Sequence, residues 1–263
     1  MNDFSSLGYA KADATIEVPE PKAREVKTVA AEIPVAIVSP AGYVKGDEFK
    51  EPQRLIVIYS GGTKREKDYF RLITRNPELF PLLKLKFYVD ENLGPGHRPL
   101  VFDLALTQTR SYKSSADKER PDSYYVVTDV DLFMQHIIDY KPRFEAEDIS
   151  LVVSNPCLEV WLYYSKRDDK FAGFVEPDDK DKLSECVKTY VHTATGGVNT
   201  VKAIYDLDAN IANAIKNYTE DANGIPEKYS TSMYRLGQQI APLVKQGLEE
   251  LRVKRLELIE NRR

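Results

Sequence analysis

The sequence predicts an α/β fold in which a mostly parallel sheet is covered by helices on both faces. Two observations support this prediction. Apolar, β-branched runs recur along the middle of the chain, at 55–59, 124–128 and 149–153. Each run ends in a short polar turn and is followed by a segment with helical periodicity. Strands that alternate with helices over short connections are typical of parallel sheets.

The composition is that of a soluble globular protein. Hydrophobic residues make up 42% of the 263 residues and charged residues 30%, and the formal net charge is -4. Because there is no overall basic field, contact with nucleic acid would need a local patch or a partner subunit. Two cysteines, no signal-peptide pattern and no membrane-length apolar stretch lead us to expect a reduced, cytoplasmic protein without a membrane segment.

Three regions differ in pattern. Residues 1–53 are punctuated by prolines and are expected to form a partly ordered N-terminal extension, in which 33–38 could be a short strand or a docking segment. Residues 54–165 form the predicted α/β core. Residues 166–263 lack strand patterns and are predicted to be helical.

The core elements are predicted from apolar periodicity. The glycines and proline at 94–96 are expected to break the chain between the second strand and the second helix, and the third helix is expected to start at Leu132. Strands are expected at 55–59, 83–89, 124–128 and 149–153, and helices at 64–76, 100–112, 132–140 and 157–164. The C-terminal helices are expected at 178–192, 198–218 and 231–261, with an apolar stripe on the last one that packs on the core or on a partner helix.

Acidic side chains follow the strand at 124–128. If strand geometry persists through Asp131, the carboxylates of Asp129 and Asp131 point to the same side and repel each other unless a cation joins them. Magnesium prefers such oxygen ligands. Alternatively, both residues belong to a solvated turn, where aspartate is common.

Polar residues also follow the strand at 149–153. Ser154 or Asn155 could cap the next helix, and Glu159 in its first turn could supply a third carboxylate. Glu159 could equally complement the helix dipole. Since ligands of parallel sheets bind beyond the carboxyl ends of the strands, Asp129, Asp131 and Glu159 are the predicted metal ligands.

The first strand runs into a glycine turn that opens a helix. Amides of Gly61 and Gly62, together with the cations Lys64 and Arg65, could bind a phosphate, although the spacing is not that of a P-loop. A solvated helix start is the alternative.

Three stretches together resemble the RloB-like proteins, which include the second component of the AbiL abortive-infection system. They are Ile-Val-Ile-Tyr-Ser-Gly-Gly-Thr-Lys-Arg-Glu-Lys-Asp-Tyr-Phe at 56–70, Tyr-Val-Val-Thr-Asp-Val-Asp at 125–131 and Ser-Asn-Pro-Cys-Leu-Glu-Val-Trp-Leu at 154–162. The third is the most specific, because the family pattern reads Ser-Asn-Pro-Cys-Phe-Glu-Leu-Trp.

The resemblance implies a Toprim-like (Rossmann-like) core and a metal-dependent nuclease of bacterial antiviral defence, often encoded beside an ABC-type ATPase. Family acidic positions correspond to Asp129, Asp131 and Glu159, and Lys64 and Glu66 match the family's Lys and Glu after the first glycine turn. The implied catalytic set is therefore Asp129, Asp131, Glu159 and Glu66.

Two positions depart from the family pattern. Ser60 stands where the first strand normally ends in glutamate, and Ser165 stands where a histidine often closes the tryptophan helix. A serine cannot anchor magnesium or shuttle protons as a carboxylate does at neutral pH. Either Glu66 or Glu159 compensates, or the site binds without cutting.

Three functions are compatible with these residues. The first is magnesium-dependent hydrolysis of phosphodiester bonds in DNA or RNA, including tRNA. In this function the protein would work with an ATPase partner, as a single chain or as a homo-oligomer. The second is a catalytically degenerate Toprim module that binds an ATPase, nucleic acid or phage trigger without cleavage. The third is a phosphate-handling enzyme that acts on a nucleotide.

Overall fold

The computed structural model describes residues 55–62, 64–87, 99–114, 121–131 and 133–260. The extension predicted at 1–53, with its segment 33–38, lies outside these residues. So do the break at 94–96, the end of the strand predicted at 83–89, and the helix start predicted at Leu132. The chain divides into the units Met1–Phe49 and Lys50–Arg263, and all described residues belong to the second.

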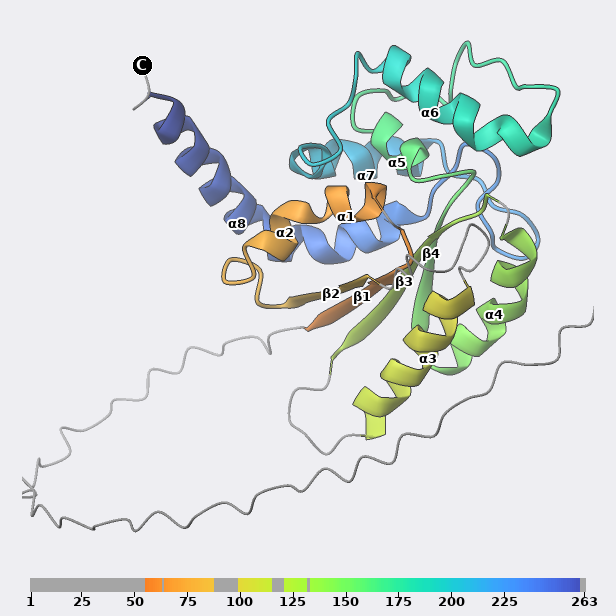
Figure 1. Ribbon diagram of the computed structural model, residues 1–263, viewed down its shortest axis with the longest axis horizontal. Helices are drawn as coiled ribbons and strands as arrows, with labels where there is room; N and C mark the ends of the chain where they lie inside the picture. The colour runs from red at the N-terminus through yellow and green to blue at the C-terminus, as the bar shows by residue number, and fades with distance from the viewer. Residues whose placement is uncertain (1–54, 63, 88–98, 115–120, 132, 261–263) are drawn as a thin grey trace, which may run out of the picture. The chain divides into compact units, whose positions relative to one another are not determined.

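The sheet has four strands in the order β2-β1-β3-β4, and all of its pairs are parallel, as predicted (Figure 1). The strands are β1 (Ile56–Ser60), β2 (Leu83–Phe87), β3 (Ser123–Asp129) and β4 (Ile149–Ser154). Every residue of β1 is buried, which explains the apolar run from Ile56 to Tyr59. The carboxyl ends of β3 and β4 lie side by side, with Asp129 paired to Ser154.

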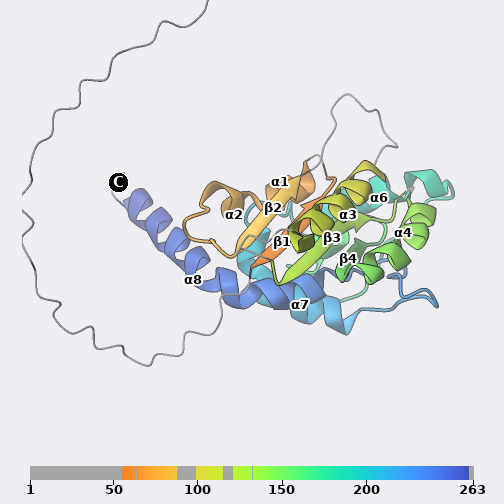
Figure 2. The same cartoon turned by 90° about the horizontal axis from the view of Figure 1, so that it is seen from below.

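Helices cover both faces of the sheet (Figures 1 and 2). One face packs against α3 (Pro99–Ser114) and α4 (Met134–Ala146), and the shared core includes Val57, Val126 and Phe144. The other face packs against the remaining helices around Ile58, Trp161 and Leu236. These helices are α1 (Arg65–Tyr69), α2 (Arg71–Arg75), α5 (Glu159–Tyr163), α6 (Leu183–Ala194), α7 (Leu207–Lys216) and α8 (Met233–Glu260).

Several helix bounds differ from the predictions. The helix predicted at 64–76 is two short helices that meet at Phe70, whose ψ of 6° departs from helical geometry. Phe70 is fully buried, with its ring centroid 5.0 Å from that of Tyr69, so packing on the sheet takes precedence over helix continuity. Conversely, α4 continues past the predicted end at Tyr140 and includes Pro142.

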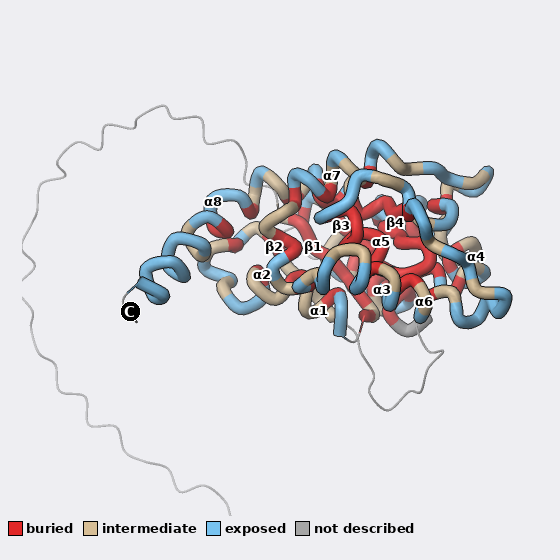
Figure 3. The backbone as a smooth tube through the Cα atoms, turned by 90° about the horizontal axis from the view of Figure 1, so that it is seen from above, coloured by how far each residue is buried: buried red, intermediate tan, exposed pale blue. Residues whose placement is uncertain are grey.

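The helical region predicted from residue 166 shares the core of the sheet. Val187 of α6, Leu207 of α7 and Leu236, Ile240 and Val244 of α8 belong to one apolar cluster with the strand residue Ile58. Short 3-10 turns at Lys180–Lys182 and Ala203–Asp206 precede α6 and α7, so both helices start later than predicted. Burial is concentrated around the sheet, and the last turns of α8 are exposed (Figure 3).

None of the described helices combines the length and the apolar character needed to span a bilayer.

Candidate functional site at the carboxyl ends of the strands

All buried acidic side chains of the described residues lie at one end of the sheet. Glu66, Asp129 and Glu159 have relative exposures of 4%, 8% and 3%, whereas the other described aspartates and glutamates are half-buried or exposed. Carboxylates are rarely buried unless a partner compensates them. Their position beyond β1, β3 and β4 therefore identifies this end of the sheet as the candidate site.

The end of β1 combines a serine, a glycine and a glutamate. Ser60 is buried, and its hydroxyl oxygen accepts a hydrogen bond of 3.2 Å from the backbone N–H of Gly62. The Glu66 carboxylate reaches back from α1 to this turn. A β-carbon added at Gly62 would lie 1.9 Å from Cδ of Glu66, so only glycine leaves room for the carboxylate.

At the end of β3 the chain turns sharply. The condition under which Asp129 and Asp131 would point to the same side is not met, because β3 ends at Asp129 and Asp131 has a φ of 29°. Asp129 is buried, whereas Asp131 is exposed. The Asp131 carboxylate accepts a hydrogen bond of 3.1 Å from the Ser184 hydroxyl of α6. The backbone N–H of Asp131 donates to the carbonyl of Pro156. Asp129 and Asp131 are therefore held in different environments.

Glu159 starts α5 and faces a cation of α1. Nε of Arg65 lies 3.1 Å from Oε1 of Glu159, and Nη1 of Arg65 donates a hydrogen bond of 3.1 Å to the Thr200 hydroxyl. The Glu159 side chain is 4% exposed and that of Arg65 is 48% exposed. Oε1 of Glu159 accepts no hydrogen bond of good geometry among the described residues, although it lies at ion-pair distance. Arg65 thus neutralises Glu159 while leaving an acceptor available.

Cys157 lies among these carboxylates. Burial raises the pKa of its thiol well above the ordinary value, and the nearby charges of Glu159 and Asp129 raise it further. The thiol also lies 4.0 Å from the backbone oxygen of Ser184. A buried thiol that stays protonated is a poor nucleophile, so Cys157 acts here as a packing residue.

Neither residue predicted to cap α5 does so. The Ser154 hydroxyl pairs with that of Thr231 at 2.8 Å, and the Asn155 amide donates to the carbonyl of Pro226 at 2.7 Å. The N-cap of α5 is Leu158, which makes no side-chain cap bond. The prediction was wrong because these two side chains bind the loop before α8, which is more than seventy residues away in sequence.

The predicted phosphate-binding residues lie next to the buried acids. Lys64 and Arg65 are exposed at the start of α1, and Gly61 and Gly62 belong to the turn between β1 and that helix. Only five residues form α1, so its dipole alone is a weak anion site. Lys64, which is exposed, and the glycine amides are the groups placed to meet a phosphate, and the Gly62 N–H would exchange its bond to Ser60 for one to the phosphate.

The grouping of the acidic side chains can be compared with the predicted magnesium ligands Asp129, Asp131 and Glu159. Within the described ranges, no three acidic, histidine or cysteine side chains are gathered closely enough to form a ready-made metal cage. Magnesium commonly takes one or two protein carboxylates and completes its shell with water and substrate phosphate. The carboxylates at this end of the sheet fit that kind of site and not one built from protein ligands alone.

Two residues that contact the site were not predicted from sequence. Ser184 and Thr200 lie in the region after residue 166, yet they bind Asp131 and Arg65. Amphipathic periodicity places such residues on a helix or a loop but does not identify what they contact. Ser165, which stands where the family often has histidine, is buried and donates to the carbonyl of Leu162 at 2.7 Å, so it closes the helix end locally.

Comparison with known proteins identifies a family. Residues 56–240 match the sequence model described as RloB-like protein. No curated protein and no solved structure matches the chain significantly. The matched range contains β1 to β4, all three buried acids and most of the helical region. Because the match covers more than half of the chain, this protein belongs to the RloB-like family.

Proposed function

We propose that this protein is a magnesium-dependent nuclease that hydrolyses phosphodiester bonds of DNA or RNA. The observation that carries the proposal is the location of Glu66, Asp129 and Glu159. They are the three buried acids of the described residues, and all lie beyond the carboxyl ends of parallel strands. Buried carboxylates that lie together beyond the strand ends of a parallel sheet favour a site for a ligand.

Each group has a part in this proposal. Asp129 would be the principal metal ligand, and either Asp131 or Glu159 would supply a second carboxylate, since no three such side chains are gathered closely among the described residues. A bound magnesium ion would activate water and neutralise the departing oxygen. Lys64, Arg65 and the amides of the glycine turn would hold the phosphate against this end of the sheet.

Glu66 is proposed as the acid that replaces the strand-end glutamate. Ser60 cannot hold or transfer a proton at neutral pH as a carboxylate would. The Glu66 carboxylate, however, lies against Gly62, only two residues after Ser60. It therefore supplies a carboxylate to the tip of β1 from the following helix.

The test is cleavage of plasmid DNA and of tRNA by the full chain, with magnesium and with EDTA. We expect cleavage that needs magnesium and falls at least about a hundredfold in Asp129→Asn. The matched control is Asp208→Asn, because Asp208 is an exposed carboxylate on α7. Cleavage that survives intact in the double variant Asp129→Ala and Asp131→Ala would refute the assignment.

The biological setting is part of the same proposal. We propose that the nuclease acts in bacterial antiviral defence together with an ABC-type ATPase, either as a single chain or as a homo-oligomer. The support is membership of the RloB-like family. The check is whether an ATPase encoded beside it co-purifies with the full chain and changes the cleavage rate. An ATPase that neither binds nor alters cleavage argues against this partner.

A second function is favoured by Ser60 itself. A Toprim module without the strand-end acid could bind nucleic acid, an ATPase or a phage trigger without cutting. The Ser60 hydroxyl already accepts the N–H of Gly62 and is buried, so it is engaged in structure. Nucleic-acid binding without magnesium, absent cleavage, and a gain of cleavage in a folded Ser60→Glu variant would favour this function over the first.

A further inference from the structure

The outer edge of β4 is paired over only part of its length. β4 is an edge strand of the sheet, and residues just before α8 run antiparallel to its carboxyl end. The backbone N–H of Ser232 donates to the carbonyl of Val153 at 2.8 Å, and the N–H of Val153 donates to the Ser232 hydroxyl at 2.8 Å. One residue later the chain enters α8 at Met233 and leaves the strand.

Further toward the start of β4, the backbone groups on the outer edge have no strand beside them among the described residues. In a strand, alternate residues direct their N–H and C=O groups to opposite sides. Because Val153 bonds outward, the backbone groups of Leu151 and Ile149 also point outward. Among the residues that the structure describes, no N–H or C=O group pairs with Leu151 or Ile149 on that side. Exposed edges of this kind are normally covered, charged or interrupted in natural proteins.

A groove follows this vacant edge. It has a volume of about 560 Å³ and is lined by residues 149–153 of β4, by Arg235, Gln238 and Gln239 of α8, and by Lys141 and Glu145 of α4. The groove is bounded by α4 on one side and by α8 on the other, so an occupant along β4 would lie between these two helices.

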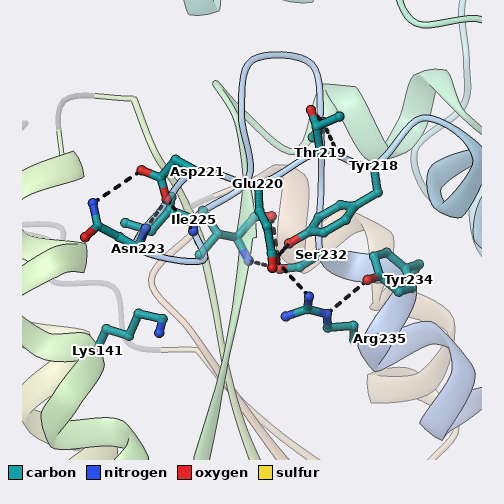
Figure 4. A network of polar contacts seen from close by, with 12 residues as sticks. Lys141, Tyr218, Thr219, Glu220, Asp221, Asn223, Ile225, Ser232, Tyr234 and Arg235 are labelled. Carbon is teal, nitrogen blue, oxygen red and sulfur yellow. Dashed lines mark hydrogen bonds and ion pairs between the residues drawn. The ribbon is translucent and has the colours of Figure 1, made fainter.

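The charges of the groove walls are already paired. Arg235 lies 3.0 Å from Glu220 and donates to the Tyr234 hydroxyl (Figure 4). Lys141 lies 2.6 Å from Glu145. Tyr218 donates to Glu220, which fixes this side of the wall. Because opposite charges are balanced within the walls, the groove has no basic surface for a phosphate backbone and suits an uncharged occupant.

We propose that the β4 edge binds an extended peptide segment of another protein, which adds a fifth strand to the sheet and continues the ladder begun by Ser232. Backbone groups of Leu151 and Ile149 supply the hydrogen bonds. Side chains of the peptide alternate between the α4 wall and the glutamine-rich α8 wall, so a sequence that alternates apolar and uncharged polar residues fits. This surface is separate from the buried acids of the candidate nuclease site.

The probe is a fluorescein-labelled octapeptide of alternating threonine and valine, measured by fluorescence anisotropy with the full chain. A control peptide carries N-methyl groups on its two central residues, which blocks hydrogen bonding along both of its edges. We expect the control peptide to bind about tenfold more weakly. Equal binding of the two peptides, or absence of binding by the unmodified one, overturns the proposal.

The protein variant is Leu151→Pro, which removes the outward N–H and leaves the bonds to β3, since these come from neighbouring residues. Leu151→Val is the matched control that keeps the N–H. We expect about tenfold weaker peptide binding for the proline variant only, with the fold verified by circular dichroism. Equal peptide binding by the two folded variants overturns the proposal.

Hydrogen exchange tests the edge without any substitution. Amides of Leu151 and Ile149 should exchange rapidly in the free chain and become protected when the octapeptide is added. Protection already present in the free chain would mean that the edge is closed, and this outcome overturns the proposal. Sedimentation should be the same for Leu151→Pro and Leu151→Val, because a second copy bound at this edge would be lost only in the proline variant. A dimer that is lost only in Leu151→Pro overturns the proposal.

Discussion

Polar groups lie at two margins of the sheet, which are the carboxyl ends of its strands and the outer edge of β4. The two margins carry different kinds of polar group. At the carboxyl ends of the strands, the polar groups are the buried side chains of Glu66, Asp129 and Glu159. Along the outer edge of β4, they are backbone groups of Leu151 and Ile149 that border a groove. The first margin holds buried charged side chains, whereas the second, among the described residues, is paired only near the carboxyl end of β4, where Ser232 bonds with Val153.

This difference separates two sources of binding specificity. Buried carboxylates are costly unless partners compensate them, and we propose that those at the strand ends form a site for a charged ligand. Unpaired strand edges are satisfied by water in the free protein and accept any chain of suitable geometry. The carboxyl ends are therefore suited to select a ligand by charge, and the β4 edge is suited to select one by backbone shape.

The largest expected effect comes from filling the space beside Gly62. Gly62→Ala places a β-carbon 1.9 Å from Cδ of Glu66, so the carboxylate must leave the turn. We expect the free energy of unfolding to fall by about 3 kcal/mol, measured by urea denaturation, because overpacking forces neighbouring groups to shift.

The second variant in this cycle is Glu66→Ala. In the Glu66→Ala background the added β-carbon meets no carboxylate, so Gly62→Ala should cost at least about 1 kcal/mol less than it does in the wild-type chain. Equal costs in both backgrounds would show that Glu66 does not occupy the turn, and this would remove the support for Glu66 as the replacement acid.

A smaller effect is expected from the ion pair at the same margin. Arg65→Met leaves Glu159 buried without its cation. Fully buried pairs cost about 3–5 kcal/mol when one partner is lost, and exposed pairs cost about 0–1 kcal/mol. Since Arg65 is 48% exposed, we expect an intermediate loss of about 2 kcal/mol in thermal or urea unfolding.

Neutralising Glu159 provides the control for this pair. Adding Glu159→Gln to Arg65→Met removes the uncompensated charge while keeping the shape of the side chain, so most of the lost stability should return. A double variant as unstable as Arg65→Met alone would mean that the lost hydrogen bond from Arg65 to Thr200, and not charge, accounts for the loss.

The two margins were not equally predictable from the sequence. Apolar runs that end in Ser60, Asp129 and Ser154 mark strand ends, and parallel topology brings such ends together, so sequence patterns alone are enough to locate the candidate site. The backbone turn at Asp131 could not be predicted, because its φ of 29° arises from contacts with Pro156 and Ser184.

The open edge of β4 has no counterpart in the sequence pattern. Leu151 belongs to an ordinary apolar run, and nothing in that run distinguishes an edge strand from a central one. Edge position depends on the strand order β2-β1-β3-β4, and the pairing with Ser232 joins residues 79 positions apart. Long-range pairing of backbone groups is therefore the part of this fold that local patterns do not encode.

The smallest effect is expected where the β4 edge is closed. Ser232→Ala removes the hydroxyl that accepts the N–H of Val153 but keeps the backbone bond from Ser232 to the Val153 carbonyl. Loss of one buried acceptor should lower the free energy of unfolding by about 1 kcal/mol. Hydrogen exchange should show faster exchange of the Val153 amide, while exchange of the Leu151 amide, already unpaired, should not change.

Ser150→Ala is the matched control, because Ser150 is exposed on the same strand. If the Leu151 amide also accelerated in Ser232→Ala, it would have been bonded before the substitution, and the contrast between the closed and open parts of this edge would not hold.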